Sequence, residues 1–84
     1  MEEKVFIVLA TSEVCYDNLE TEVVAIKRTR ESAEKVIADR KAFINKIWKN
    51  KNLEIDEDVA GCFSCHNDNG YDYQVWLEER KIED

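Results

Sequence analysis

The feature that most constrains this chain is a run of six consecutive apolar residues, 5–10, close to its start. The run is rich in β-branched side chains and therefore predicts a β-strand. Because successive side chains of a strand point to opposite faces, a strand that is apolar throughout is expected to lie inside a sheet with both faces covered. An 84-residue chain has enough residues for one small domain, spanning 1–84, whose core must provide that cover.

The next two segments predict a second strand and a helix. Residues 21–28 favour a strand that pairs with the first as an antiparallel hairpin, after a polar connection over 13–18 with a turn at Asp17 and Asn18. A helix over about 30–50 is expected, capped by Thr29 or Ser32. Its apolar residues recur at helical spacing and form one stripe: Ala33, Val36, Ile37, Phe43, Ile44, Ile47 and Trp48.

The remainder predicts one or two further strands. The acidic stretch 54–58 is interpreted as a solvated connection, and residues 61–66 as a segment that pairs with the last strand. Asn69 and Gly70 favour a type I′ hairpin turn. Residues 71–79 alternate between apolar and polar side chains, as a half-buried strand does, and the tail from Arg80 onward is expected to fray. The predicted fold class is α+β, an antiparallel sheet of three to four strands with one long amphipathic helix packed on one face (β-β-α-β-β or β-β-α-β).

Charge and composition limit the compartment and the partners. No stretch approaches the roughly 20 apolar residues that span a bilayer, and the acidic start is unlike a signal peptide, so a cytoplasmic protein is expected. The formal net charge is −7, yet nine of the twelve basic residues lie within 27–51. A chain of this kind is expected to present a positive helix and negative ends.

Three cysteines and one histidine raise the question of a cofactor. Cys62, Cys65 and His66 match the C-x-x-C-H pattern of haem attachment, but no second histidine is present as an axial ligand, so haem is rejected. Zinc held by Cys15, Cys62, Cys65 and His66 is a second hypothesis. If 61–67 is a strand, Cys62 and Cys65 point to opposite faces and cannot chelate together. Free thiols that fill small spaces are the favoured interpretation, and no cofactor is expected.

Two residues stand out as candidates for a protein interface. Trp76 shares a strand face with Asp72, Gln74 and Glu78, and this face is predicted to look away from the helix. Aromatic residues in such places often anchor interfaces, although packing within the chain is an alternative. A homodimer through the sheet, or residues 53–65 folded over it, would cover this face. Arg40 interrupts the apolar stripe of the helix, and it either extends its head to water or a carboxylate or contacts a partner.

Nucleic acid is a further candidate partner. The helix lysines Lys35, Lys41, Lys46 and Lys49 are the predicted phosphate contacts, whereas an acidic pI of about 4.7 opposes non-specific binding. The opposite hypothesis is a negative surface that mimics nucleic acid or docks on a basic patch. Its candidate residues are Glu54, Asp56, Glu57, Asp58, Asp68, Asp72, Glu78 and Glu79.

The segment Val23-Val24-Ala25-Ile26, followed by the Thr29-initiated helix, resembles small β-β-α-β proteins of phage and bacterial genomes that are uncharacterised. In that group a strand rich in tyrosine and acidic residues closes the domain, as residues 71–79 are expected to do here. This chain departs from the group by a longer helix and an insertion over 53–69. No activity is established for the group, so the resemblance implies no residue roles. The favoured hypothesis is a small acidic non-enzymatic protein-binding module, such as a phage-encoded inhibitor of a host factor. The alternatives are nucleic-acid association and a zinc-stabilised domain.

Overall fold

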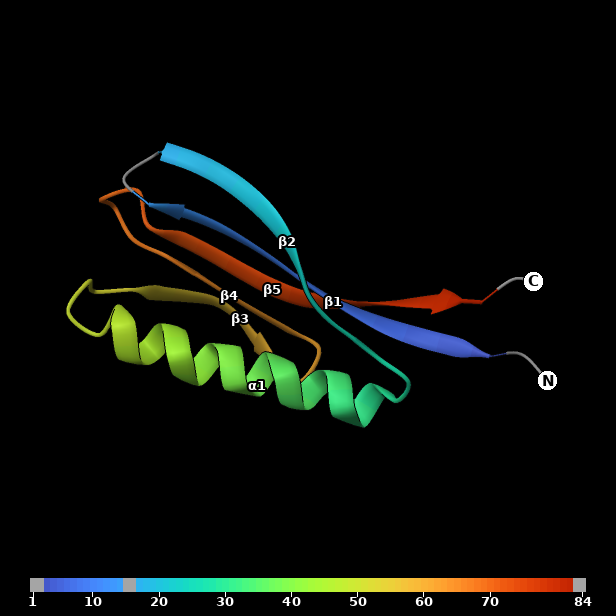
Figure 1. Cartoon of the computed structure of the whole chain (residues 1–84). Coiled ribbons are helices and arrows are strands. Elements are labelled where there is room, and N and C mark those ends of the chain that lie inside the picture. Colours follow the sequence, from blue (N-terminus) through green and yellow to red (C-terminus); the bar gives the residue numbers. More distant parts are fainter. Residues whose placement is uncertain (1–2, 15–16, 83–84) are drawn as a thin grey trace.

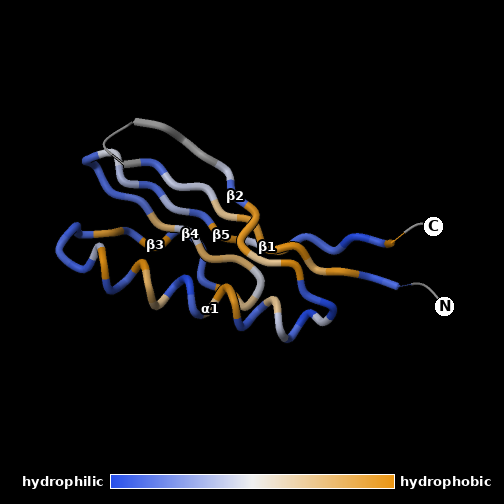
Figure 2. Tube along the Cα trace, viewed as in Figure 1, coloured by the Kyte–Doolittle hydropathy of each residue, from blue (hydrophilic) through white to orange (hydrophobic). Residues whose placement is uncertain are grey.

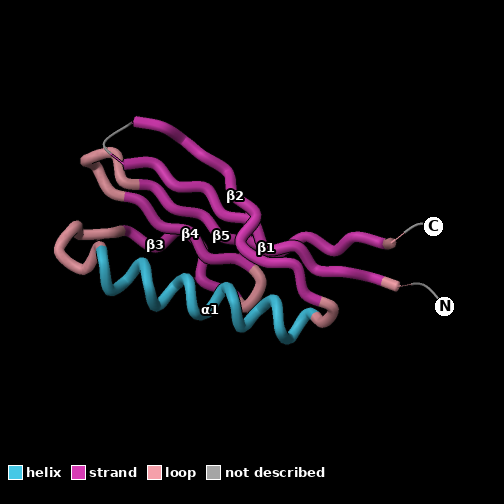
Figure 3. Tube along the Cα trace, viewed as in Figure 1, coloured by secondary structure: helices cyan, strands magenta, loops and turns pink. Residues whose placement is uncertain are grey.

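The computed structural model describes residues 3–14 and 17–82. Within them five strands and one helix follow in the order β1, β2, α1, β3, β4, β5 (Figures 1 and 3). The strands form one sheet with the order β2-β1-β5-β4-β3, and every neighbouring pair is antiparallel. Helix α1 covers one face of this sheet (Figure 1). The predicted α+β class and the single helix on an antiparallel sheet are confirmed, but the sheet has five strands and not the predicted three to four.

Strands β1 (Lys4–Val14) and β2 (Asp17–Lys27) form the predicted hairpin, and both are longer than expected. Of the predicted polar connection, Glu13 and Val14 belong to β1, and Asp17 and Asn18 belong to β2 and not to a turn. Polar residues extend these strands because each continues the hydrogen-bonded ladder of its neighbour, which outweighs their weak strand propensity. Strand β1 is an inner strand, as predicted, since it pairs with β2 on one side and β5 on the other.

Helix α1 (Arg30–Ile47) begins at the predicted cap. The Thr29 hydroxyl accepts a hydrogen bond from the Ser32 N–H at 3.1 Å, which satisfies one of the free N–H groups of the first turn. The helix ends three residues before position 50, and Asn52 then adopts a left-handed φ of 53°. Asparagine tolerates that conformation better than most residues, which suits the change of direction into the next strand.

The apolar stripe of α1 is only partly buried. Ala33, Ile37 and Ile44 face the sheet and are buried, whereas Phe43 and Ile47 are 51% and 48% exposed. The prediction that Phe43 and Ile47 belong to the packed stripe is therefore wrong. At about 100° per residue, Ala33, Ile37 and Ile44 point within about 40° of one another and face the sheet, whereas Phe43 points about 100° away from Ile44, toward the side of the helix.

Strand β3 (Glu54–Val59) replaces the predicted solvated connection and pairs with β4 (Cys62–His66). All six of its residues are exposed, and a register shift between Ile55 and Glu57 leaves Asp56 as a bulge. Aspartate and glutamate are poor strand formers, so local preference does not predict this strand, and the ladder with β4 supplies the missing stabilisation. An acidic, bulged edge strand also resists pairing with a further chain.

The connection from β4 to β5 (Asp72–Lys81) is a hairpin, as predicted, but its turn is not type I′. Gly70 has a φ of 87°, while Asn52 is the sole described non-glycine residue with positive φ, so Asn69 cannot occupy the first I′ position. The Asn67 carboxamide oxygen instead accepts hydrogen bonds from the N–H groups of Asn69 and Tyr71 at 2.9 and 3.0 Å. This side-chain turn determines the shape of the loop.

Strand β5 shows the predicted alternation and extends further than expected. Tyr73 and Val75 are buried on the helix side, whereas Gln74 is exposed on the other. Arg80 and Lys81, expected to fray, pair with Val5 and Lys4 of β1, and the Ile82 N–H donates to the Glu3 carbonyl at 2.9 Å. The ends of β1 and β5 thus form a two-stranded ribbon beyond β2 and β4, which accounts for the 48 Å length of the molecule (Figure 1).

The core lies between α1 and the face of the sheet that it covers. Hydrophobic stretches of β1 and β2 run next to each other, and the hydropathy along α1 alternates with its turns (Figure 2). At the C-terminal end of α1, the Trp48 ring meets Tyr71 and Tyr73 edge-on, with centroids 5.1 and 6.3 Å apart. The buried apolar residues are Phe6, Val8, Ala10, Ala33, Ile37, Ile44, Trp48, Phe63, Cys65, Tyr73 and Val75.

Candidate functional site

The second face of the sheet, which we call the open face, carries apolar side chains that no described element covers. Among the described elements α1 alone packs against the sheet, and it lies on the opposite side (Figure 1). In β1 the residues facing α1 are buried, but Ile7 and Leu9 on the open face remain half-buried. The expectation that β1 is covered on both faces is thus not met within the described chain. Residues 53–65 do not fold over this face, because they extend the sheet sideways as β3 and β4.

Strand register arranges the open face in bands that cross the strands. The apolar band is centred on Trp76, which lies opposite Leu9 on β1 and Cys62 on β4. Two β-branched residues continue this band, since Val23 of β2 pairs with Leu9 and Val59 of β3 pairs with Cys62. The exposed fractions of Val23 and Val59 are 59% and 63%. Next to this band, Ile7 pairs with Ile26, which is 62% exposed.

Trp76 combines an apolar ring with a polar edge. Its ring is half-buried between the neighbouring strands, and its indole N–H donates to Glu78 at 3.5 Å. The other carboxylate oxygen of Glu78 accepts from Arg80 at 2.7 Å. A tryptophan with this kind of polar contact suits an interface that is apolar in the middle and wet at its border. The prediction that Trp76, Asp72, Gln74 and Glu78 share the face away from the helix is confirmed by the register of β5.

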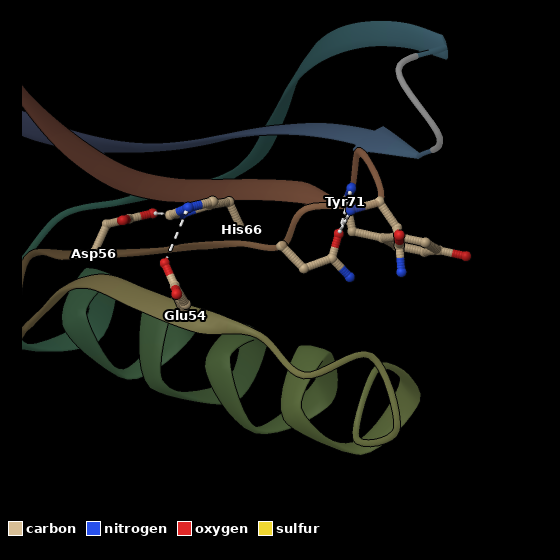
Figure 4. Close-up of polar contacts among 6 residues, drawn as sticks. Glu54, Asp56, His66 and Tyr71 are labelled. Atoms are coloured by element: carbon tan, nitrogen blue, oxygen red, sulfur yellow. Dashed lines mark hydrogen bonds and ion pairs between the residues drawn. The ribbon is translucent and has the colours of Figure 1, made fainter.

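An acidic band lies four residues along β5 from Trp76. In register it contains Glu13 of β1, Asp72 of β5, His66 of β4 and Glu54 of β3. Figure 4 shows His66 beside Glu54 and Asp56. Its Nδ1 is 2.7 Å from Asp56 and its Nε2 is 3.4 Å from Glu54. The hydrogen bond to Asp56, together with the negative charges of Asp56, Glu54 and Asp72, raises the pKa of His66 above 6.5 despite some loss of solvation.

A polar band separates the apolar and acidic bands. It consists of Thr11, Gln74, Ser64 and Glu57, which are in register across β1, β5, β4 and β3. Ser64 is buried beneath its neighbours, whereas Gln74 and Glu57 are exposed. The open face therefore changes from apolar to hydrogen-bonding to acidic along the direction of the strands.

The two described cysteines lie on opposite faces of β4, as the strand interpretation required. Cys65 is buried under α1, and Cys62 is half-buried on the open face. Burial raises the pKa of both thiols to about 11, helped at Cys62 by a hydrogen bond to Glu57 and at Cys65 by the charge of Asp72. Cys15 lies outside the described residues. Over residues 3–14 and 17–82, no three His, Cys, Asp or Glu side chains are grouped to hold a metal ion.

The remaining predicted site residues divide between other surfaces. Arg40 reaches Glu22 of β2 at 3.4 Å, so its head meets a carboxylate on the helix side of the sheet. The Tyr73 hydroxyl lies close to Arg40 and is buried; burial raises the pKa of Tyr73, and the positive charge of Arg40 partly offsets this rise. Arg40 is thus remote from the Trp76 face, and the structure does not bring these two interface candidates together.

The helix lysines also separate. Lys41 turns toward β3, where its amine donates to Asp58 at 2.6 and 2.7 Å and lies 5.7 Å from the centre of the Phe63 ring. Lys35, Lys46 and Lys49 are exposed on α1 and the turn that follows it. The predicted basic surface is therefore a row of three lysines and not four.

Of the eight predicted acidic-surface residues, five belong to the open face. These are Glu54, Asp56, Glu57, Asp72 and Glu78. Asp58 faces Lys41, Glu79 lies 3.8 Å from Lys4, and Asp68 is in the β4–β5 connection. Sequence analysis missed Glu13 and the apolar residues Val23, Ile26 and Val59, because their place on the open face follows from strand pairing.

Comparison of the chain with protein-family models, with curated proteins and with solved structures returned no match. Among the described residues, no helix has the length and apolar character needed to cross a membrane.

Proposed function

We propose that this chain is a small non-enzymatic module that binds another protein through its open face, with Trp76 as the anchor. The observation that carries the proposal is the apolar band around Trp76. The outer face of a one-layer antiparallel sheet is ordinarily polar. Here Val23, Ile26 and Val59 are each about 60% exposed beside the half-buried tryptophan. A contiguous apolar patch with a polar border is typical of an interaction site.

The apolar centre and the charged border of the open face have different energetic roles in this proposal. A central aromatic residue surrounded by aliphatic side chains is the usual source of affinity, and a charged border contributes specificity. Leu9 and Cys62 support Trp76 from both sides, so the ring is presented by rigid strands and loses little freedom on binding. As a further part of this proposal, the module acts as an inhibitor, such as one that a phage directs at a host factor, by occupying a surface that its target needs.

The test compares three baits, the wild-type protein, Trp76→Ala and Phe43→Ala, after circular dichroism has verified that each is folded. Phe43 is the matched control because it is an exposed aromatic residue on α1, away from the open face. We expect a binding protein that wild type and Phe43→Ala retain equally and that Trp76→Ala binds at least about 30-fold more weakly, as for an interface hot spot. Proteins that bind Trp76→Ala as well as wild type, but do not bind Phe43→Ala, would contradict the proposal.

Nucleic-acid association remains a second candidate, favoured by the exposure of Lys35 and Lys46 on α1 and of Lys49 in the turn that follows it. Binding of that kind would weaken steeply with salt and would be insensitive to Trp76→Ala. Fluorescence anisotropy with labelled single- and double-stranded oligonucleotides between 50 and 200 mM salt, roughly the range over which phosphate contacts weaken, distinguishes the two candidates.

A further inference from the structure

The order of the bands on the open face bears on the chemistry of the partner, and the inference rests on the protein-binding function proposed above. We propose that the partner is a basic segment that places an apolar side chain on the Trp76 band and a lysine or arginine on the acidic band.

The charge of the open face favours a basic partner. Its strand residues include the carboxylates of Glu13, Glu54, Asp56, Glu57, Asp72 and Glu78. Within the described strands, Arg80 is the permanently cationic residue on this face, and it is already paired with Glu78 at 2.7 Å. Protonation of His66 offsets one of these negative charges at most, so the band stays negative on either side of the histidine pKa.

A second copy of the chain fits this face poorly. Face-to-face packing would bring together two surfaces that are both negative, and the chain as a whole has a net charge of −7. Like charges placed opposite each other across an interface oppose association. An apolar segment without charge would fill the Trp76 band but would leave the carboxylates desolvated and unpaired, which is costly.

The distance between the Trp76 band and the acidic band determines how far apart the apolar and basic residues of the partner must lie. Asp72 and Trp76 are four residues apart on β5, which corresponds to about 13 Å along a strand. A helical partner covers about 13 Å in eight or nine residues, and an extended partner covers it in about four. The apolar anchor and the basic residue should therefore be separated by about eight or nine positions in a helix, or by about four in an extended segment. Between them, Gln74 and Thr11 offer hydrogen bonds to polar side chains or to backbone.

The test uses a displayed library of random 16-residue peptides, about the length of a segment that spans both bands in either conformation. The library is selected against four folded proteins. They are the wild type, Trp76→Ala, the double variant Glu54→Gln with Asp72→Asn, and a control double variant, Glu31→Gln with Asp39→Asn. The control removes the same formal charge from α1 and leaves the open face intact.

We expect wild type and the α1 control to enrich the same peptides, with apolar and basic residues at the spacing given above. Trp76→Ala should lose this enrichment. The Glu54/Asp72 variant should keep the apolar residue, lose the basic preference, and bind a wild-type-selected peptide about 3- to 10-fold more weakly, with a flatter salt dependence. Amide chemical shifts should place that peptide across β1, β5 and β4.

Other outcomes separate the two proposals. Trp76-dependent peptides without basic residues, or an equal effect of the α1 control, would overturn the basic partner and leave the protein-binding function standing. A dimer that Trp76→Ala dissociates in analytical ultracentrifugation would show that the occupant is a second copy. Selection that fails to enrich any Trp76-dependent peptide would overturn both.

Discussion

Replacing Ile37 by alanine tests the packing of α1 on the sheet most directly, because the sequence assigns Ile37 and Phe43 to the same apolar stripe. In the structure Ile37 is 2% exposed and Phe43 is 51% exposed. Ile37→Ala removes three buried carbon atoms, which costs about 2.4 kcal/mol at about 0.8 kcal/mol each. The cavity adds about 1 kcal/mol. The higher helix propensity of alanine returns about 0.4 kcal/mol. The expected loss is about 3 kcal/mol.

The same reasoning predicts a much smaller effect at Phe43. Half-burial of its ring is worth about 1 kcal/mol, and the better helix propensity of alanine offsets about half of it. Phe43→Ala should therefore cost about 0.5 kcal/mol. For an 84-residue domain, whose total stability is about 4–13 kcal/mol, the two variants are readily distinguished.

Urea unfolding monitored by far-ultraviolet circular dichroism measures both variants. With an m-value of about 1.3 kcal/mol per molar, the midpoint should fall by about 2 M for Ile37→Ala and by less than about 0.5 M for Phe43→Ala. Tryptophan fluorescence should follow the same transition, because Trp48 packs at the end of this core. Equal losses for the two variants would refute the assignment of the buried helix face, as would an Ile37→Ala loss below about 1 kcal/mol.

Three further predictions concern single groups. Thr29→Ala should lower the free energy of unfolding by about 1 kcal/mol because it removes the N-cap, whereas Thr29→Ser should not. Equal urea midpoints for the two variants would contradict the capping role of Thr29. His66 should titrate above 6.5 in nuclear magnetic resonance spectra, and Asp56→Asn should lower its pKa. The folded state holds the His66 proton more tightly than the unfolded state, so His66 contributes to the free energy of unfolding fully below pH 6.5, and this contribution is lost as pH rises through the folded-state pKa. A His66 contribution that falls toward lower pH would refute this prediction. Cys62 and Cys65 should react slowly with a thiol reagent at pH 8, because a pKa of about 11 leaves about 100-fold less thiolate than a pKa of 9.0; rapid labelling of the folded protein at Cys65 would be inconsistent with its burial.

The sequence by itself determined the strands and the helix whose own residues show a clear periodicity or cap. The continuous apolar run of β1, the alternation of β5 and the capped, periodic helix all follow from local periodicity and side-chain chemistry. Local periodicity was also sufficient to place Trp76 on the face away from α1, since it depends only on the alternation within one strand.

Tertiary structure decided which segments gain a partner strand and which side of the helix faces the sheet. Residues 54–59 are a strand because β4 offers them a ladder, although their own composition disfavours one. Phe43 and Ile47 are exposed because the docking of α1 turns the line of Ala33, Ile37 and Ile44 toward the sheet and leaves these two side chains at its border. The bands of the open face bring Glu13, Asp72, His66 and Glu54 together from four strands, and strand register, which pairs residues far apart in the chain, is the physical reason that this site could not be assembled from sequence alone.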